Sequence, residues 1–461
     1  MQTVEATASA HVAQWATGVA ADAIPPAIRA RAQTCLIDTI GVAIAGSRSE
    51  AAGFARALCL EGGTQGASTA FGASRPFSAQ AAAFANGTAA HAYDFDDNCY
   101  AGFVHGSAVI APATLAVGQK VGASGAEAIT AFAIGAECEY AFGAATRNAL
   151  YERGWWTTGV LGPLGASMAA ARLLGLDAAR AQTAFGLALA GAGGMKACFG
   201  SDAKVLLAGR ASEAGVVCAE LAARGASGPA RVVEEPNGFA NLFNGGTFEH
   251  AGLAVLGRHW YLEDPGADVK RIPVCLSSHA AVDAVLELVE AHRLDAADIV
   301  SIVCDVPPVV RANLKYDRPH SVREAQFSMP FAIAAALRFP SFDLSRLDMA
   351  SLADEALVAL MARVSMQTSP IWDKPGMREY APEGARVILT RRDGAPIEAF
   401  RDKARGSATD PLSADEIAQK FLACVSPVLG DRRAANLLAR LEQLDGPVAL
   451  RDLFADAGGP T

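Results

Sequence analysis

Apolar residues recur with a helical period along most of the first 265 positions of the chain. Apolar side chains three and four residues apart form continuous faces, and several alanine-rich stretches are apolar all round, which is typical of helices buried on every side. The consecutive prolines Pro25 and Pro26 mark one helix start. The predicted helices span residues 11–19, 26–44, 51–60, 78–93, 108–121, 125–148, 162–174 and 177–190.

The pattern changes near Asp264, in a segment rich in Asp, Pro and Gly. An apolar run at 299–306 predicts a strand, and two short runs at 385–389 and 397–400, on either side of Arg392-Asp-Gly, predict a β-hairpin. Helical periods surround these strands. They predict helices at residues 280–292, 328–337, 349–363, 414–425 and 431–444.

Strands confined to one stretch, with helices before and after it, indicate a mostly α protein. We expect a large all-helical domain made of residues 1–265 and 406–461, with a smaller α+β domain of residues 266–405 inserted into it. The length of 461 residues also favours two domains, because single cores rarely grow that large. No regular repeat of fixed period is present.

Composition narrows the range of functions. Hydrophobic residues make up 51% of the chain, which is enough for a large core. The formal net charge of −9 argues against general nucleic-acid binding, so no nucleic-acid partner is expected. Apolar runs are interrupted before about twenty residues, and no membrane span is expected. A pocket for an anion would have to be locally positive against this acidic background.

The nine cysteines are widely spaced and include no Cys-x-x-Cys pair. This pattern is typical of reduced thiols in a cytoplasmic protein, and it disfavours an iron–sulfur cluster. The first residues, Met1 to Ala6, lack the basic and apolar segments of a secretory signal. We therefore expect a cytoplasmic location.

Candidate chemistry concentrates in one stretch. His91, Asp94, Asp96, Asp97 and His105 fall within fifteen residues between two apolar segments. Polar groups that point into a core cost several kcal/mol unless they are paired or used. If the stretch begins as a helix, its first polar residues share a face. A helix end capped by Asp is one interpretation; a metal site is another, although the spacing fits no usual metal pattern, and we expect no metal.

The motif His91-x-x-Asp94-Phe-Asp-Asp, followed by His105-x-Ser-Ala and Pro112, resembles the MmgE/PrpD family. Further stretches match in the same order and extend the resemblance over nearly the whole chain; they lie at 159–166, 199–215, 270–279, 316–319 and 324–330. The family contains 2-methylcitrate dehydratases, cis-aconitate decarboxylase and iminodisuccinate epimerase. The resemblance implies a large helical domain with an inserted smaller domain, and a homodimer.

The resemblance also implies roles for individual residues. Lys204 matches the active-site lysine; on residues alone, a glycine-flanked lysine either binds a carboxylate, acts as a base or extends to solvent. Tyr151 matches a candidate proton-transfer tyrosine of the epimerase. Asp94, His105 and Tyr151 supply transferable protons, and Asp94 also supplies a base, so the catalytic set is Asp94, His105, Tyr151 and Lys204. The substrate-binding set is His91, Asn98, Trp156, Lys270, Cys275, His279 and Tyr316. His279 is equally consistent with capping or packing.

Several positions depart from the family pattern. Trp156 and Leu207 stand where relatives frequently carry histidine, Asn98 replaces a common threonine, and Cys275 replaces a histidine found in some relatives. Two adjacent tryptophans, Trp155 and Trp156, also fit packing in a core or an interface. These replacements count against 2-methylcitrate and cis-aconitate as substrates.

These residues suggest abstraction of a proton next to a carboxylate of a small di- or tricarboxylate. Such chemistry needs a base and cationic groups that stabilise the developing charge. We expect a cofactor-independent lyase or isomerase. Dehydration is the favoured reaction, and epimerisation and decarboxylation are the alternatives. A non-catalytic homologue that binds a metabolite is the remaining interpretation. No Walker loop and no dinucleotide-binding glycine motif after a strand is present.

Overall fold

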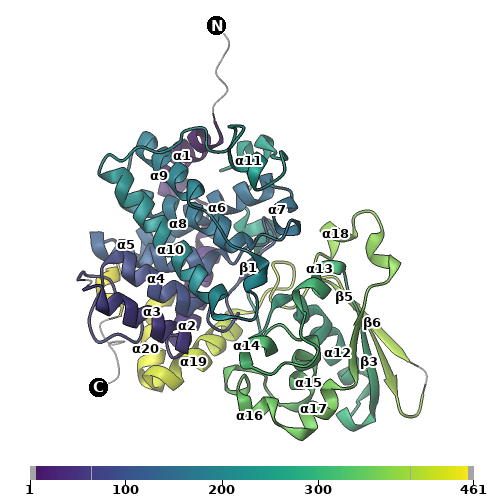
Figure 1. The fold of residues 1–461 in the computed structure, drawn as a ribbon. Helices are drawn as coiled ribbons and strands as arrows, with labels where there is room; N and C mark the ends of the chain where they lie inside the picture. The colour runs from purple at the N-terminus through teal and green to yellow at the C-terminus, as the bar shows by residue number, and fades with distance from the viewer. Residues whose placement is uncertain (1–6, 64, 395, 455–461) are drawn as a thin grey trace.

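The computed structural model describes residues 7–63, 65–394 and 396–454, and it is mostly α-helical, as predicted. The first six residues, on which the secretory-signal argument rests, lie outside the described part. A large helical body occupies one side of the molecule, and the body that carries the sheet occupies the other (Figure 1). The large body contains α1 (Ala8–Gly18), α2 (Pro26–Gly46), α3 (Glu50–Glu61), α4 (Ala79–Ala90), α5 (Gly106–Val121), α6 (Gly125–Ala145), α7 (Ala149–Glu152), α8 (Thr157–Leu173), α9 (Ala178–Ala190), α10 (Asp202–Ala223), α11 (Phe239–Leu242), α19 (Ala414–Leu429), α20 (Asp431–Glu442) and α21 (Leu450–Leu453).

The smaller body is built around a four-stranded sheet of order β4-β3-β5-β6. Strand β3 (Ile299–Asp305) pairs in parallel with β4 (Val364–Gln367) and antiparallel with β5 (Ala385–Arg391), and β5 pairs antiparallel with β6 (Ile397–Arg401). The predicted strand and hairpin are thus present, and β4 is an addition. The helices of this body are α12 (His279–His292), α13 (Pro308–Asn313), α14 (Val322–Ala325), α15 (Met329–Arg338), α16 (Met349–Leu352), α17 (Glu355–Met361) and α18 (Met377–Tyr380).

Some predicted helices end early or are divided; the helix predicted at 125–148, for example, ends at Ala145. The helix predicted at 78–93 ends at Ala90, and the one predicted at 349–363 is divided into α16 and α17. The division has a local cause, because the Asp354 carboxylate accepts a hydrogen bond from the Leu357 N–H and so caps a new helix start. Capping by Asp competes with helix continuation.

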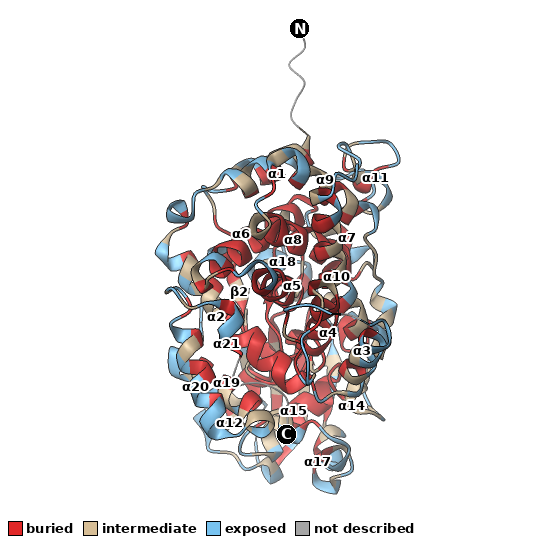
Figure 2. Ribbon diagram, turned by 90° about the vertical axis from the view of Figure 1, so that its left-hand side faces the viewer, coloured by how far each residue is buried: buried red, intermediate tan, exposed pale blue. Residues whose placement is uncertain are grey.

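Helices α4, α5, α8 and α10 form the buried centre of the large body (Figure 2). The 22-residue helix α10 was not predicted, because glycines interrupt its pattern. The structure explains two of these glycines. A side chain at Gly209 would collide with Phe84 and Thr88 of α4, and one at Gly215 would collide with Ala166 of α8. The missing side chains let α10 approach both helices closely.

The C-terminal helices return to the large body. A side chain at Gly41 of α2 would meet the Phe421 ring of α19, so these helices touch at a glycine. One apolar core joins residues from Ala8–Val269 with residues from Ile417–Phe454, and a second core uses residues from Ile272–Leu389. We propose on this basis the division into 1–265 with 406–461 and 266–405. The two-residue ladder of β1 (Asn98–Cys99) with β2 (Ala267–Asp268) links the two parts.

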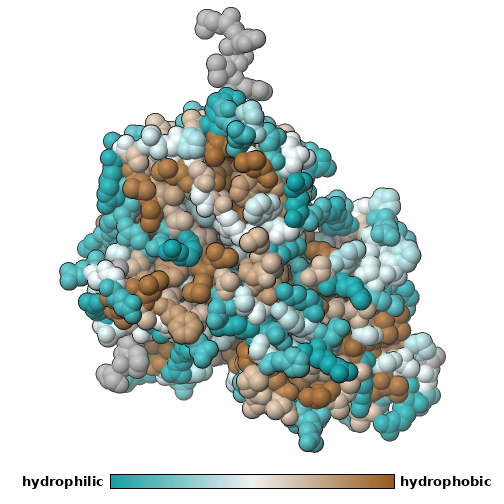
Figure 3. Space-filling model, in the orientation of Figure 1, coloured by the Kyte–Doolittle hydropathy of each residue, from teal (hydrophilic) through white to brown (hydrophobic). Residues whose placement is uncertain are grey.

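The surface carries no extended apolar belt on the face shown in Figure 3, where hydrophilic residues separate the apolar patches. Exposed large apolar side chains include Phe54, Leu58 and Met195. Across the described ranges, no helix combines the length and apolar character that a bilayer crossing requires.

Candidate active site

The loop between α4 and α5 contains the candidate residues from His91 to His105, and most of them are buried. It is not helical after Ala90, so the shared helix face expected for His91, Asp94 and Asn98 is wrong. Asp94 instead has a positive φ of 49°, a conformation that Asp tolerates better than most residues. The chain then pairs through β1 and turns back to His105, which precedes α5. The turn brings the His91 and His105 rings to 4.7 Å.

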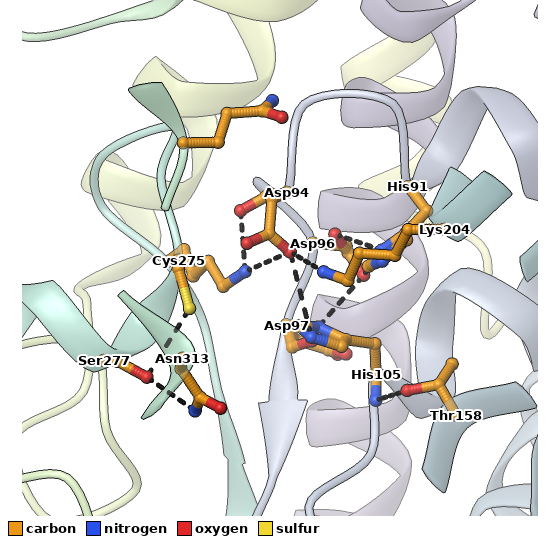
Figure 4. A network of polar contacts seen from close by, with 12 residues as sticks. His91, Asp94, Asp96, Asp97, His105, Thr158, Lys204, Cys275, Ser277 and Asn313 are labelled. Atoms are coloured by element: carbon orange, nitrogen blue, oxygen red, sulfur yellow. Dashed lines mark hydrogen bonds and ion pairs between the residues drawn. The ribbon is translucent and has the colours of Figure 1, made fainter. Parts of the chain in front are cut away.

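Asp94 is the centre of a buried ion cluster (Figure 4). Its Oδ1 lies 2.8 Å from Nζ of Lys204 and 3.2 Å from Nζ of Lys270, which also donates to the Asp94 carbonyl oxygen at 2.6 Å. Burial alone would raise the pKa of Asp94, but the two ammonium groups outweigh it and hold that pKa well below the usual range. Asp94 is therefore a weak base, and its charge fixes both lysines.

The two histidines differ in their surroundings. His91 is fully buried, its Nδ1 lies 2.8 Å from Asp96, and burial lowers the pKa of His91 to about 4. His105 lies 2.9 Å, through Nδ1, from the carbonyl oxygen of Asp97. Since a carbonyl only accepts, this contact assigns the proton to Nδ1 and leaves Nε2 of a neutral His105 as an acceptor.

Asp96 contacts both histidines. One of its oxygens lies 2.8 Å from Nδ1 of His91 and 3.3 Å from Nδ1 of His105. Burial would raise the pKa of Asp96, but the two imidazoles hold it well below the usual value. The carboxylate therefore stays charged and orients His105, whose Nε2 lies 3.8 Å from Oδ1 of Asp94.

A small cavity of about 20 Å³ lies beside this cluster, between the two bodies. Its volume is enough for about one water molecule. The walls must separate before a compound with several carbon atoms can enter. It is lined by Asn98, Phe103, His105, Tyr151, Trp156, Phe199, Lys204, Cys275, Leu276, Asn313, Phe327 and Glu383.

Six of the expected site residues line this cavity: Asn98, His105, Tyr151, Trp156, Lys204 and Cys275. His91, Asp94 and Lys270 do not line the cavity. His91 contacts Asp96, and Asp94 contacts both Lys270 and the cavity-lining Lys204. Trp156 stacks on His91 with ring centroids 5.5 Å apart. Burial raises the pKa of Tyr151 well above its usual value and that of Cys275 to about 11, so both stay protonated at neutral pH.

Besides His91 and Lys270, the expected substrate-binding residues His279 and Tyr316 lie outside the cavity lining. His279 is buried at the start of α12, its Nε2 lies 3.2 Å from the Val274 carbonyl oxygen, and burial lowers its pKa to about 3. This environment favours the packing interpretation. Tyr316 packs against the apolar group of Trp156, Phe199 and Phe327, and its hydroxyl donates to the Phe199 carbonyl oxygen at 3.4 Å.

Sequence reasoning missed the opposite wall of the cavity. Glu383, Asn313 and Ser277 come from three separate segments of the smaller body and form one hydrogen-bonded group. Lys196, which the sequence gave no reason to select, places its ammonium 3.1 Å from the centre of the Tyr151 ring. Ser277 lies in the family-like stretch 270–279, whereas Glu383 and Asn313 lie outside every such stretch, so no signal in the sequence pointed to these two.

His91, Asp94, Asp96 and His105 also bring four possible metal ligands within 4.8 Å of one another. The chemistry of the donors suits a divalent cation. Their charge environment does not, because the Lys204 and Lys270 ammonium groups already neutralise Asp94 and would repel a cation beside it. The expectation of no metal stays a prediction.

Both halves of the chain match models of one protein family. The family model of the MmgE/PrpD N-terminal domain matches residues 10–251, and that of the MmgE/PrpD C-terminal domain matches residues 272–444. The chain belongs to the MmgE/PrpD family. Its ion cluster and cavity thus lie where the two family domains meet.

Similar members of the family carry lyase names. A cis-aconitate decarboxylase-like protein of Aspergillus oryzae is 26% identical, over 99% of this chain and 98% of its own length. The cis-aconitate decarboxylase of Homo sapiens is 26% identical, over 79% of this chain and 76% of its own. The cis-aconitate decarboxylase of Aspergillus terreus is 24% identical, over 97% of this chain and 95% of its own length. These names favour decarboxylation, which we expected only as an alternative, over dehydration.

Proposed function

We propose that this member of the MmgE/PrpD family is a cofactor-independent carboxy-lyase that acts on a small di- or tricarboxylate. The observation that carries the proposal is the buried cluster in which Lys204 and Lys270 share the Asp94 carboxylate beside a cavity lined by His105. Buried ammonium groups in such a site attract a carboxylate, since water does not screen them there.

The lysines would stabilise the charge that develops during the reaction. In a decarboxylation the bond to the departing carboxyl carbon breaks, carbon dioxide leaves, and the electron pair passes into the conjugated carboxylate that remains. Lys204 lines the cavity and would contact that carboxylate directly. Asp94, which also pairs with Lys270, holds the Lys204 side chain in place. A proton then adds to carbon.

His105 and Tyr151 are the proposed proton donors and acceptors. Nε2 of neutral His105 is free to accept a proton, and the Tyr151 hydroxyl, which donates to Oδ1 of Asn313 at 3.0 Å, is protonated at neutral pH. Asp94 was expected to be a base. Its lowered pKa favours an electrostatic role instead.

Dehydration and epimerisation would begin instead with abstraction of a proton next to a carboxylate. Hydroxide then leaves in a dehydration, and the proton returns to the other face of the carbon in an epimerisation. The similar proteins named decarboxylases support the carboxy-lyase over both. A non-catalytic homologue would not need the Asp96-oriented His105 next to a lysine. A homodimer and a cytoplasmic location, both expected from the sequence, remain predictions; light scattering of the purified protein tests the first.

The decisive experiment is proton NMR of the purified protein in D2O with cis-aconitate, 2-methylcitrate, citrate, malate and iminodisuccinate, with released carbon dioxide measured in parallel. We expect carbon dioxide together with deuterium in the product from one of these compounds or a close analogue. Water loss without carbon dioxide would replace the proposal by a dehydratase. Inversion alone would replace it by an epimerase, and no reaction would contradict the carboxy-lyase.

A further inference from the structure

Glu383 is a buried carboxyl group on the cavity wall opposite Lys204. It lies between α18 and β5, it is only 7% exposed, and it lines the same cavity as His105 and Lys204. The Tyr100 hydroxyl donates to its Oε2 at 3.1 Å, and Ser277 and Asn313 donate to its Oε1. The Ser277 and Asn313 side chains lie across the site from Asp94 and His105 (Figure 4).

The hydrogen-bond directions around Ser277 indicate that Glu383 is an acceptor. The Ser277 oxygen accepts from the Asn313 amide at 3.1 Å and from the Cys275 thiol at 3.5 Å, so its own hydrogen is left for Glu383. Burial is the largest influence on Glu383 and raises its pKa; the Ser277 and Tyr100 hydrogen bonds reduce that rise without cancelling it. A carboxylate offers about four acceptor positions, and these neighbours fill three.

The two walls of the cavity therefore differ in what they would bind. On one side Lys204 offers an ammonium group, which suits a substrate carboxylate. On the other side, Glu383 forms no ion pair with any residue in the described part of the chain within 4.0 Å. A second substrate carboxylate at that wall would meet the acceptor oxygens of Glu383 and offer them no hydrogen, whereas a hydroxyl or amino group would fill the open acceptor position.

We propose that Glu383, held by Ser277 and Asn313, is a specificity-determining residue that accepts a hydrogen bond from a hydroxyl or amino group of the substrate. The substrate class is then a small di- or tricarboxylate with such a donor, rather than a purely carboxylate compound such as cis-aconitate. This inference rests on the proposed function, because Lys204 must hold a substrate carboxylate for Glu383 to meet the other end. It also gives a reason for a pocket in which Trp156 and Cys275 replace histidines.

Calorimetric titration with matched ligand pairs tests the inference. Malate differs from succinate, and citrate from tricarballylate, by a single hydroxyl group. We expect the wild-type protein to bind each hydroxylated member about tenfold or more tightly than its partner. In Glu383→Gln, whose amide fills the position with a donor of its own, that preference should fall below about threefold. Glu398→Gln, the same change at an exposed position of β6, should retain it.

Equal binding of both members of each pair by the wild type would overturn the inference, and so would a preference that survives in Glu383→Gln. If that variant fails to fold, the wild-type comparison alone decides. Turnover separates this inference from the proposed function. A protein that releases carbon dioxide from cis-aconitate but shows no hydroxyl preference, or binds none of the four ligands, keeps the proposed function and loses the inference. A protein that shows the hydroxyl preference but releases carbon dioxide from no compound of the panel loses the proposed function.

Discussion

The ammonium group of Lys204 lies 2.8 Å from Oδ1 of Asp94, although 110 positions separate the two residues in the chain. Both side chains are buried, and Lys270 approaches the same oxygen. Asp94 therefore has two cationic partners, so one of them can be removed without leaving a buried carboxylate unpaired. This arrangement allows the role of Lys204 to be separated from its contribution to folding.

Lys204→Met is expected to lower the turnover number by about 10²–10³, because the methionine keeps the apolar stem and loses the charge that meets the developing carboxylate anion. The thermal midpoint should change little, since Lys270 still pairs with Asp94. Steady-state kinetics and thermal unfolding measure the two effects. Lys120→Met is the control, because it makes the same change in an ion pair outside the site, with Glu220 at 2.6 Å, where the lysine is more exposed. Full activity in Lys204→Met would contradict the proposal.

Asp96→Asn should lower the turnover number about 10–100-fold while ligand affinity stays within about threefold. The amide removes the charge that orients His105 and can place a donor against Nδ1, 3.3 Å away. The pH dependence of turnover should shift as well, because the imidazole loses a neighbouring anion. Asp305→Asn, at another buried Asp that accepts from Trp372 at 3.0 Å, should affect stability alone. An unchanged pH profile would show that Asp96 is merely structural.

The sequence revealed one half of the candidate site and not the other. Asp94, His105, Lys204 and Lys270 lie in stretches that resemble a known family, so their proximity could be expected before their distances were known. Glu383 lies 106 positions from Ser277 and 70 from Asn313, and neither Glu383 nor Asn313 lies in a stretch that resembles the family. Such a group exists only after the smaller body has folded, because long-range packing and not local pattern brings its members together.

The same distinction applies to the fold. Long periodic helices were predicted to within a few residues, since an apolar face determines them locally. Helix α10 was missed because Gly209 and Gly215 lower helix propensity, and the reason for both glycines is contact with α4 and α8. The helix predicted to reach residue 93 ends at Ala90, and Asp94 beyond it has a positive φ that no helical period in the sequence reveals.

Lys420→Met should destabilise the protein by about 3–5 kcal/mol, because it leaves Asp38 buried without its cation. Nζ of Lys420 lies 2.6 Å from Asp38 and donates to the carbonyl oxygen of Phe95, next to Asp94, at 2.9 Å. The variant should therefore lose activity as well as stability. The double variant Asp38→Asn with Lys420→Met should recover most of the thermal midpoint but not the turnover. Recovery of both would show that Lys420 does not position the loop.

Glu139→Gln should make stability less dependent on pH. Glu139 is fully buried in α6, and neither of its oxygens has a hydrogen-bond partner among the residues that the structure describes. Burial, reinforced by Asp97, raises its pKa to about 8. The raised pKa means that the folded protein holds this proton more tightly than the unfolded chain. The resulting stability is fully present below about pH 4 and is lost as the pH rises through about 8.

Between pH 6 and pH 9 this one carboxyl group should cost the wild type up to ~3 kcal/mol, whereas the neutral amide of Glu139→Gln costs nothing over that range. Asp97, Glu137 and Asp268 have raised pKa values too, so both proteins lose stability with rising pH and the difference between them isolates Glu139. Urea midpoints at the two pH values give that difference, with exposed Glu398→Gln as the control. Parallel curves for the variant and the wild type would mean that Glu139 is already ionised at pH 6, and that a partner for its charge exists inside the folded protein.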